Sequence, residues 1–288
     1  MTQRERTDLV PAPHGRALAA PEQRNLITRG LVDLERSDAE DLFELGLEGF
    51  RLLLAIFGQD GVDPGWTAAR RAADHGNAEA QYWLGAVYSN GHGVSADASE
   101  AAKWFRRAAE QDHAAAQFNL GYMYYTGRGV PQNDEEAVRW YRRAAEQDHA
   151  AAQFNLGVMY YNGQGVDQDY GDAARCYRRA AEQDHAAAQF NLGYMYYTGL
   201  GVPLDDEEAV RWYRRAAEQG LAAAQFNLGF MYYNGLGVTH DYGEAARWHR
   251  RAAEQGLAAA QFNRGFMYSD GMDTFEDIIC GTLASMPN

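Results

Sequence analysis

One segment returns at a spacing of 36 residues through most of this chain. Its glutamine stands at Gln81, Gln117, Gln153, Gln189, Gln225 and Gln261, and a leucine follows three residues later in every copy except the last, where Arg264 stands. A fixed period of this size is typical of a stacked repeat array, and not of a domain with one central cleft. Because a unit this short cannot bury its own apolar face, each copy must pack against its neighbours.

The first half of each copy has the pattern of an amphipathic helix. In the copy that runs over residues 114–125, Ala116, Leu120 and Met123 are spaced by three and four residues and share one face. Gly127 ends this helix, and Gly129 permits a tight turn that a β-carbon would obstruct. The glycine pair recurs in the other copies except the last, where Gly271-Met272-Asp273 lacks the second glycine, which indicates the same turn in the copies that keep it.

The second half of each copy begins at a helix-capping residue. This position is filled by Asp97, Asn133, Asp169, Asp205 and Asp241, and an acidic residue follows three residues later in each case. Trp140, Tyr141 and their small neighbours form the apolar face of the helix that follows. It ends at a residue type that tolerates the left-handed backbone, namely Gly76, Asp112, Asp148, Asp184, Gly220 or Gly256. The sequence therefore predicts an all-α solenoid of antiparallel helix pairs.

The ends of the chain depart from the period and set the domain boundaries. Residues 1–36 are polar, with three prolines and no helical pattern, so we expect a disordered or loosely attached arm. Residues 37–76 are predicted to form a degenerate capping helix pair, with helices beginning at Ser37 and at Pro64. The repeat array then covers residues 77–270, and residues 271–288 form either a C-terminal cap or a truncated repeat.

Composition and charge exclude several classes of protein. The formal net charge of -14 disfavours nucleic acid as a partner and favours a neutral or basic one. Neither a secretory signal nor an apolar run long enough to span a membrane is seen, which predicts a soluble cytoplasmic protein. The two cysteines give no disulfide framework, and Cys176 lies in a column of tryptophans, where we expect a small buried hydrophobe.

Several spaced motifs recur in phase from about residue 60 to residue 270. They are the AlaGlnPheAsnLeuGly helix, the GlyXaaGlyVal turn and the TrpTyrArgArgAlaAla helix. Together they resemble the Sel-1-like repeat family, whose members are related to tetratricopeptide repeats. The resemblance implies a right-handed superhelix of helix pairs that serves as an adaptor or scaffold for protein complexes. A cysteine-rich branch of that family is linked to penicillin binding, but the cysteine pairs of that branch are absent from this chain.

No motif predicts a metal, a cofactor or a catalytic group. The GlyXaaGly turns lie between helices and follow no strand, so they do not indicate a phosphate loop. His113, His149 and His185 share one column, but stacked helices lie about 8–10 Å apart, which is too far for equivalent residues to share one zinc ion. Leu221 and Leu257 fill the same column in later copies, which favours a helix-start position; a pH-sensing role is the alternative.

The recurring arginine pairs are predicted to form a solvated outer face. On the second helix of the copy, Glu135 with Arg139 and Arg142 with Glu146 have the spacing of helical ion pairs. Neighbouring acids would therefore compensate the arginines, and each exposed pair contributes only about 0.3–0.5 kcal/mol.

The first helix of each copy carries more aromatic and amide side chains than its core needs. We assign Phe118 and Tyr125 to packing between repeats, and the stripe that contains Asn119 and Tyr122 to ligand binding. The candidate residues for protein or peptide binding are Asn119, Tyr122, Asn155, Asn191, Tyr194, Asn227, Phe230 and Asn263. Asparagine can bond both the amide and the carbonyl of an extended peptide, and aromatic rings offer contact area at low entropic cost. Alternatively, these asparagines cross-link adjacent helices.

Three functions are compatible with these patterns. The first is a non-enzymatic adaptor or scaffold that binds protein or peptide through its concave face. The second, carried only by the family resemblance, is a penicillin-binding or β-lactamase-like hydrolase. The third is a structural spacer without a partner of its own.

Overall fold

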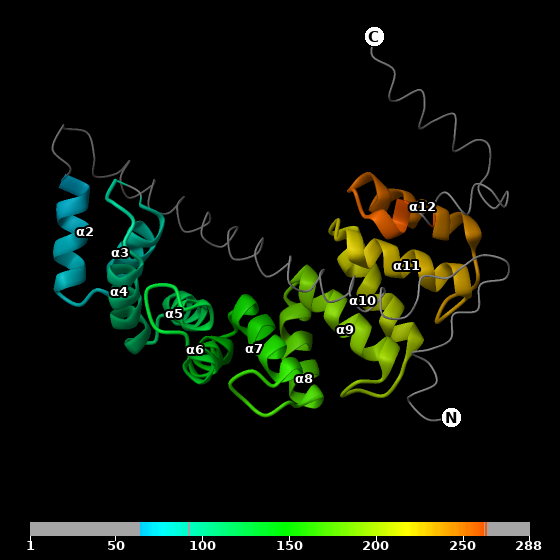
Figure 1. Ribbon diagram of the computed structural model, residues 1–288, viewed down its shortest axis with the longest axis horizontal. Helices are drawn as coiled ribbons and strands as arrows, with labels where there is room; N and C mark the ends of the chain where they lie inside the picture. Colours follow the sequence, from blue (N-terminus) through cyan, green and yellow to red (C-terminus); the bar gives the residue numbers. More distant parts are fainter. Residues whose placement is uncertain (1–63, 92, 262, 264–288) are drawn as a thin grey trace, which may run out of the picture. The chain divides into compact units, whose positions relative to one another are not determined.

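The computed structural model describes residues 64–91, 93–261 and 263, and every regular element within them is an α-helix (Figure 1). These residues fall into two compact units, one that ends at Gln183 and one that begins at Asp184. We call them the N-terminal and C-terminal units and describe each by itself. The expected arm over 1–36, the helix predicted from Ser37 and the end segment over 271–288 lie outside the described residues.

Helices of two kinds alternate along each unit. The N-terminal unit contains α2 (Pro64–Asp74), α3 (Ala78–Asn90), α4 (Ala98–Glu110), α5 (Ala114–Thr126), α6 (Asp134–Glu146), α7 (Ala150–Asn162) and α8 (Tyr170–Glu182). The C-terminal unit contains α9 (Ala186–Thr198), α10 (Asp206–Glu218), α11 (Ala222–Asn234) and α12 (Tyr242–Glu254). We call the odd-numbered helices A helices and the even-numbered ones B helices. Within each unit consecutive helices pack against one another, so the predicted all-α solenoid of helix pairs is confirmed.

The B helices begin and end as their sequences predict. The side chain of Asn133 accepts a hydrogen bond from the backbone amide of Glu136 at 3.0 Å, and the aspartates in the same column cap their helices in the same way. Beyond the last turn, Asp148 has a φ of 60° and Gly220 a φ of 93°. The left-handed stop is therefore present with either residue type.

The apolar core lies where the two helices of a repeat meet. Leu120 and Tyr141 are both buried, and the Tyr141 ring packs directly over Gly121. A β-carbon at Gly121 would lie 2.8 Å from a carbon of that ring. Glycine at this position therefore lets the A helix approach the B helix of its own repeat.

The second glycine of each turn has a role that the pattern alone did not reveal. Gly129 has a φ of 75°, and a β-carbon there would lie 2.2 Å from the backbone oxygen of Ala98, at the start of α4. Gly165 and Gly237 approach the starts of α6 and α10 in the same way. The turn after one A helix therefore rests directly on the B helix of the preceding repeat.

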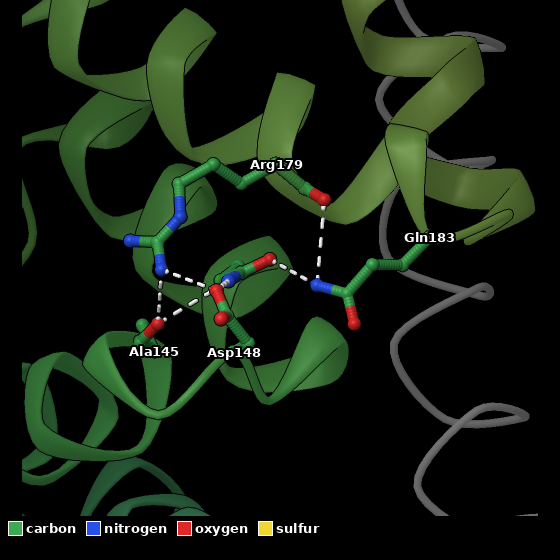
Figure 2. Close-up of polar contacts among 5 residues, drawn as sticks. Ala145, Asp148, Arg179 and Gln183 are labelled. Carbon is green, nitrogen blue, oxygen red and sulfur yellow. Dashed lines mark hydrogen bonds and ion pairs between the residues drawn. The ribbon is translucent and has the colours of Figure 1, made fainter.

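The recurring glutamine joins successive repeats. The Gln153 amide donates to the backbone oxygen of Ala145 at 3.2 Å, and its side-chain oxygen accepts from Gln183 at 2.8 Å. Figure 2 shows Ala145, Asp148, Arg179 and Gln183 gathered at this junction. Gln111 to Gln81, Gln147 to Gln117, Gln219 to Gln189 and Gln255 to Gln225 form the equivalent bonds at 2.7–2.8 Å. The bond to Ala145 joins Gln153 to the preceding repeat, and the bond to Gln183 joins the two ends of its own repeat, so this buried polar residue is satisfied within the apolar face.

Candidate binding surface

The aromatic members of the predicted stripe lie on the A helices and are partly exposed. Tyr122 of α5, Tyr194 of α9 and Phe230 of α11 are all half-buried. Each packs at the edge of a core cluster, which holds the ring while part of it faces solvent. In the C-terminal unit, Phe230 also lies edge-on to Tyr197, with ring centroids 6.4 Å apart. At the equivalent position of α7, Val158 is buried, so the row of exposed aromatic rings is interrupted there.

The asparagines of the stripe divide into two groups. Asn119 and Asn191 are buried, with 7% and 4% of their surface exposed, whereas Asn155, Asn227 and Asn263 are half-buried. The burial of Asn119 favours the alternative in which these asparagines cross-link helices, whereas the buried side-chain nitrogen of Asn191 has no acceptor among the described residues.

Two asparagine side chains interact with tyrosine hydroxyls of the same unit. Burial, with a smaller effect of Glu79, raises the pKa of Tyr82, and hydrogen bonding from Asn119 opposes this rise. Burial likewise raises the pKa of Tyr213 well above its ordinary value, and Asn227 opposes that shift. Asn119 of α5 therefore lies near Tyr82 of α3, and Asn227 of α11 lies near Tyr213 of α10, but no described residue is within hydrogen-bond geometry of the buried Tyr213 hydroxyl. For the half-buried Asn155 and Asn263, no such interaction is found among the described residues.

The polar residues at the ends of the A helices bond to their own helices. Thr126 donates to the backbone oxygen of Tyr122 at 2.8 Å, and Asn234 donates to that of Phe230 at 2.9 Å. Thr198 does the same toward Tyr194. These side chains therefore satisfy the last turn of the helix.

The arginines of the B helices have partners other than those expected. Arg139 pairs with Glu136 at 3.4 Å, and not with Glu135. Arg142 donates to the hydroxyl of Tyr160 at 3.1 Å, so its expected pair with Glu146 was wrong. The expected pairs considered one helix alone, whereas the guanidinium of Arg142 reaches an A helix packed against its own.

The three histidines act as caps of the A helices. The ring nitrogen Nδ1 of His149 accepts from the backbone amide of Ala152 at 3.3 Å, and His113 and His185 cap α5 and α9 equivalently. The His149 ring stacks on Phe118 of the preceding A helix, with centroids 4.9 Å apart, and burial lowers its pKa to about 4. The helix-start interpretation of this column is thus confirmed. In the described part of the chain, no group of three His, Cys, Asp or Glu is placed to hold a metal ion.

Cys176 is a free thiol in the N-terminal unit. It is half-buried at the edge of a core cluster, and burial raises the pKa of the thiol to about 11 despite the nearby Arg179, Arg175 and Arg142. A thiol with a raised pKa is a poor nucleophile, so its packing role is the better interpretation. Cys280 lies outside the described residues.

The helix pairs, caps and turns define a helical-repeat solenoid of the tetratricopeptide-related class. No helix among the described residues is long and apolar enough to cross a bilayer. The Sel1 repeat model matches residues 78–113, 114–149, 150–185, 186–221, 222–257 and 258–279. The chain therefore belongs to the Sel1 repeat family, as its motifs predicted. Such solenoids are commonly protein-interaction scaffolds and generally non-enzymatic.

Two solved structures are similar to this chain. A protective antigen of uropathogenic Escherichia coli, which displays an SLR fold, shares 38% identity with a TM-score of 0.72 over 84% of this chain and 52% of its own. A Sel1 repeat protein from Oxalobacter formigenes shares 35% identity with a TM-score of 0.69, over 78% of this chain and 90% of its own. The chain thus spans about half the length of the Escherichia coli protein. The comparison with curated proteins gives no match.

Proposed function

We propose that this repeat array is a non-enzymatic adaptor that binds a protein or peptide along the face formed by its A helices. The observation that carries this proposal is the recurrence of partly exposed rings at Tyr122, Tyr194 and Phe230, at the same position of three repeats. Rings held at the edge of a core lose little entropy on binding, and they exclude water from a contact. Membership of a family of interaction scaffolds supports the same conclusion.

The half-buried amides supply the polar part of the proposed contact. Asn155 and Asn263 each carry two donors and one acceptor oxygen and retain some exposure. They can bond the backbone of an extended peptide while the neighbouring rings pack against its side chains. The buried Asn119 and Asn191 belong to the predicted stripe and are proposed to support it from beneath, through contacts between helices.

Affinity capture from a native lysate, with the full chain as bait, tests whether a partner exists. The dissociation constant of a captured partner is then measured for the Asn155→Ala/Tyr194→Ala double variant. We expect it to weaken by about tenfold, with helicity and melting temperature nearly unchanged, because both residues are partly exposed. A matched control removes two exposed side chains of B helices, as Glu146→Ala/Glu218→Ala, and should bind as the unmodified chain does.

Each alternative function has its own result in these measurements. Undiminished binding by the double variant would refute the A-helix site, and a collapsed fold would assign the stripe to structure. If no partner is enriched, the spacer interpretation is favoured. A nitrocefin assay tests the hydrolase alternative, and an adaptor should show no turnover.

A further inference from the structure

A cavity of about 520 Å³ opens beside the B helices of the N-terminal unit, away from the predicted stripe. It is lined by residues of α4, α5 and α6 and of the turn that joins α5 to α6. Arg106, Arg139 and Arg143 line it, together with Tyr124 and Trp140. Cavities of roughly 300–1,000 Å³ are typical of ligand sites, so this one has room for a side chain and part of a peptide backbone.

Arg106 carries a charge that no contacting acid neutralises. Its guanidinium donates to the hydroxyl of Tyr124 at 2.5 Å, and it forms no ion pair with any described residue. A neutral hydroxyl fixes the position of the guanidinium and leaves its full positive charge. The cavity therefore contains a pre-oriented cation.

The other two guanidiniums are stacked on the Trp140 ring. Arg143 lies 4.9 Å from the ring centroid and donates to Asp112 at 2.7 Å, while Arg139 lies 5.9 Å from the centroid and pairs with Glu136 at 3.4 Å. A guanidinium has five N–H donors, so these contacts leave several of them available. The indole N–H of Trp140 is buried, and no described residue accepts from it. Guanidinium donors that these contacts do not use therefore remain in the lining of the cavity.

Two carboxylates also line the cavity and oppose the positive charge of the guanidiniums. Glu136 is the one that pairs with Arg139, and Glu110 lies four residues after Arg106 without an ion pair among the described residues. Asp112, which pairs with Arg143, and Glu136, which pairs with Arg139, balance two of the three guanidiniums, so Arg106 is the one of the three without an ion pair, in a chain whose formal net charge is -14. Long-range attraction cannot draw an anion to such a chain, so an anion that binds must be held by local contacts.

We propose that this cavity binds the carboxylate of an aspartate or glutamate in an acidic peptide segment of a protein partner. Arg106 contributes the principal contact, since a guanidinium matches a carboxylate with two parallel hydrogen bonds. The rings of Tyr124 and Trp140 form an apolar wall for the atoms next to that carboxylate. This site is separate from the A-helix face and does not depend on it.

Fluorescence anisotropy of a rhodamine-labelled hexaglutamate peptide with the full chain tests the proposal. We expect the peptide to bind at least about tenfold more tightly than the matched hexaglutamine peptide. Arg106→Gln should weaken binding by about tenfold, because it removes a charge-assisted bidentate contact. Glu110→Gln should strengthen binding several-fold, because it removes a negative charge from the lining.

Matched variants separate the cavity from other surfaces. Lys103→Gln removes one exposed positive charge from the same helix outside the cavity, so it should not change the affinity. Tyr124→Phe keeps the ring and removes the hydroxyl that positions Arg106, so it should weaken binding several-fold. It serves as the second test if Arg106→Gln fails to fold. Equal binding of the two peptides, or no loss with either variant, overturns the proposal. Competition by inorganic phosphate at the concentration at which the peptide itself competes would assign the cavity to small anions and also overturn it.

Discussion

Arg179 of α8 reaches back to Asp148, the left-handed residue that follows α6, and its guanidinium nitrogen lies 2.8 Å from the carboxylate (Figure 2). The same nitrogen donates to the backbone oxygen of Ala145 at 2.7 Å. Asp112 with Arg143 and Asp184 with Arg215 form the equivalent pairs at 2.7 Å. In the repeats that carry Gly76, Gly220 or Gly256 at this position, the backbone makes the same stop without a carboxylate. One residue thus reverses the chain in every repeat, and in three of them it also forms an ion pair with the next.

The buried glutamine at this junction should matter more than the exposed ion pair. Gln153→Ala removes buried hydrogen bonds to Ala145, Asp148 and Gln183, so we expect the free energy of unfolding to fall by about 2–3 kcal/mol. Asp148→Gly removes an exposed ion pair, worth about 0–1 kcal/mol, and also relieves the strain of a positive φ, so its net effect should stay within about 1 kcal/mol. Native-state hydrogen exchange of α6 and α7 measures both changes. Equal losses of stability in the two variants would show that the buried glutamine contributes no more to stability than the exposed ion pair.

Two glycines of the N-terminal unit separate backbone strain from steric contact. Gly93 and Gly129 have nearly the same φ, 74° and 75°. A β-carbon at Gly93 would meet no atom of the described residues within 4 Å, whereas one at Gly129 would lie 2.2 Å from the backbone oxygen of Ala98. Gly93→Ala should therefore cost about 1–2 kcal/mol, the left-handed strain alone. Gly129→Ala should cost clearly more, because the turn must move off α4.

Thermal unfolding of the two glycine variants provides the comparison. We expect a lower melting temperature for Gly129→Ala than for Gly93→Ala. Indistinguishable melting temperatures would mean that the contact between Gly129 and Ala98 contributes nothing to stability.

The sequence predicted the features that depend on one stretch of backbone. The cap at Asn133, the stops at Asp148 and Gly220, and the turn glycines obey rules of local geometry, so a single repeat is enough to recognise them. The helix pairs follow because two apolar faces in one short unit must meet. The 36-residue period then repeats the same helix pair along the chain.

Contacts between neighbouring repeats were harder to predict, because they depend on which side chain a neighbouring helix presents. Arg142 bonds to Tyr160, eighteen residues away, and not to the glutamate one turn along its own helix. Asn119 likewise interacts with Tyr82 in the preceding repeat. One signal was available: a glutamine such as Gln153, retained at the same place of every copy within an apolar face, indicates a polar bridge.

The structural and binding roles of the asparagine column can be separated by three substitutions. Asn119→Ala removes a buried side chain that interacts with Tyr82, so we expect a loss of about 1–2 kcal/mol. Asn155→Ala acts at a half-buried position and should change stability by less than about 1 kcal/mol. Leu156→Ala, one residue further on, truncates a buried side chain and should cost about 2–5 kcal/mol. Urea unfolding of the three variants measures the order, and a large loss with Asn155→Ala would contradict a free amide there.

Acid should weaken the chain through His149. Burial lowers the pKa of this histidine from 6.5 to about 4 in the folded state, so between these values the unfolded chain binds more protons than the folded one. The stability that the neutral His149 contributes to the fold is therefore fully present above about pH 6.5 and is lost as the pH falls toward 4. The shift corresponds to a loss of order 3 kcal/mol across that window. Protonation of Nδ1 also removes the acceptor that caps the amide of Ala152.

The variant His149→Asn isolates this effect, because asparagine is a good helix cap that does not titrate. Its stability, measured by urea unfolding from pH 7 to pH 4, should fall less steeply than that of the unmodified chain. His149→Leu reproduces Leu221, which makes no side-chain cap, and should have the same shallow slope with a lower stability at pH 7. If all three chains share one slope, His149 does not set the acid sensitivity, and groups common to all three chains set it, among them His249, whose pKa burial also lowers to about 4.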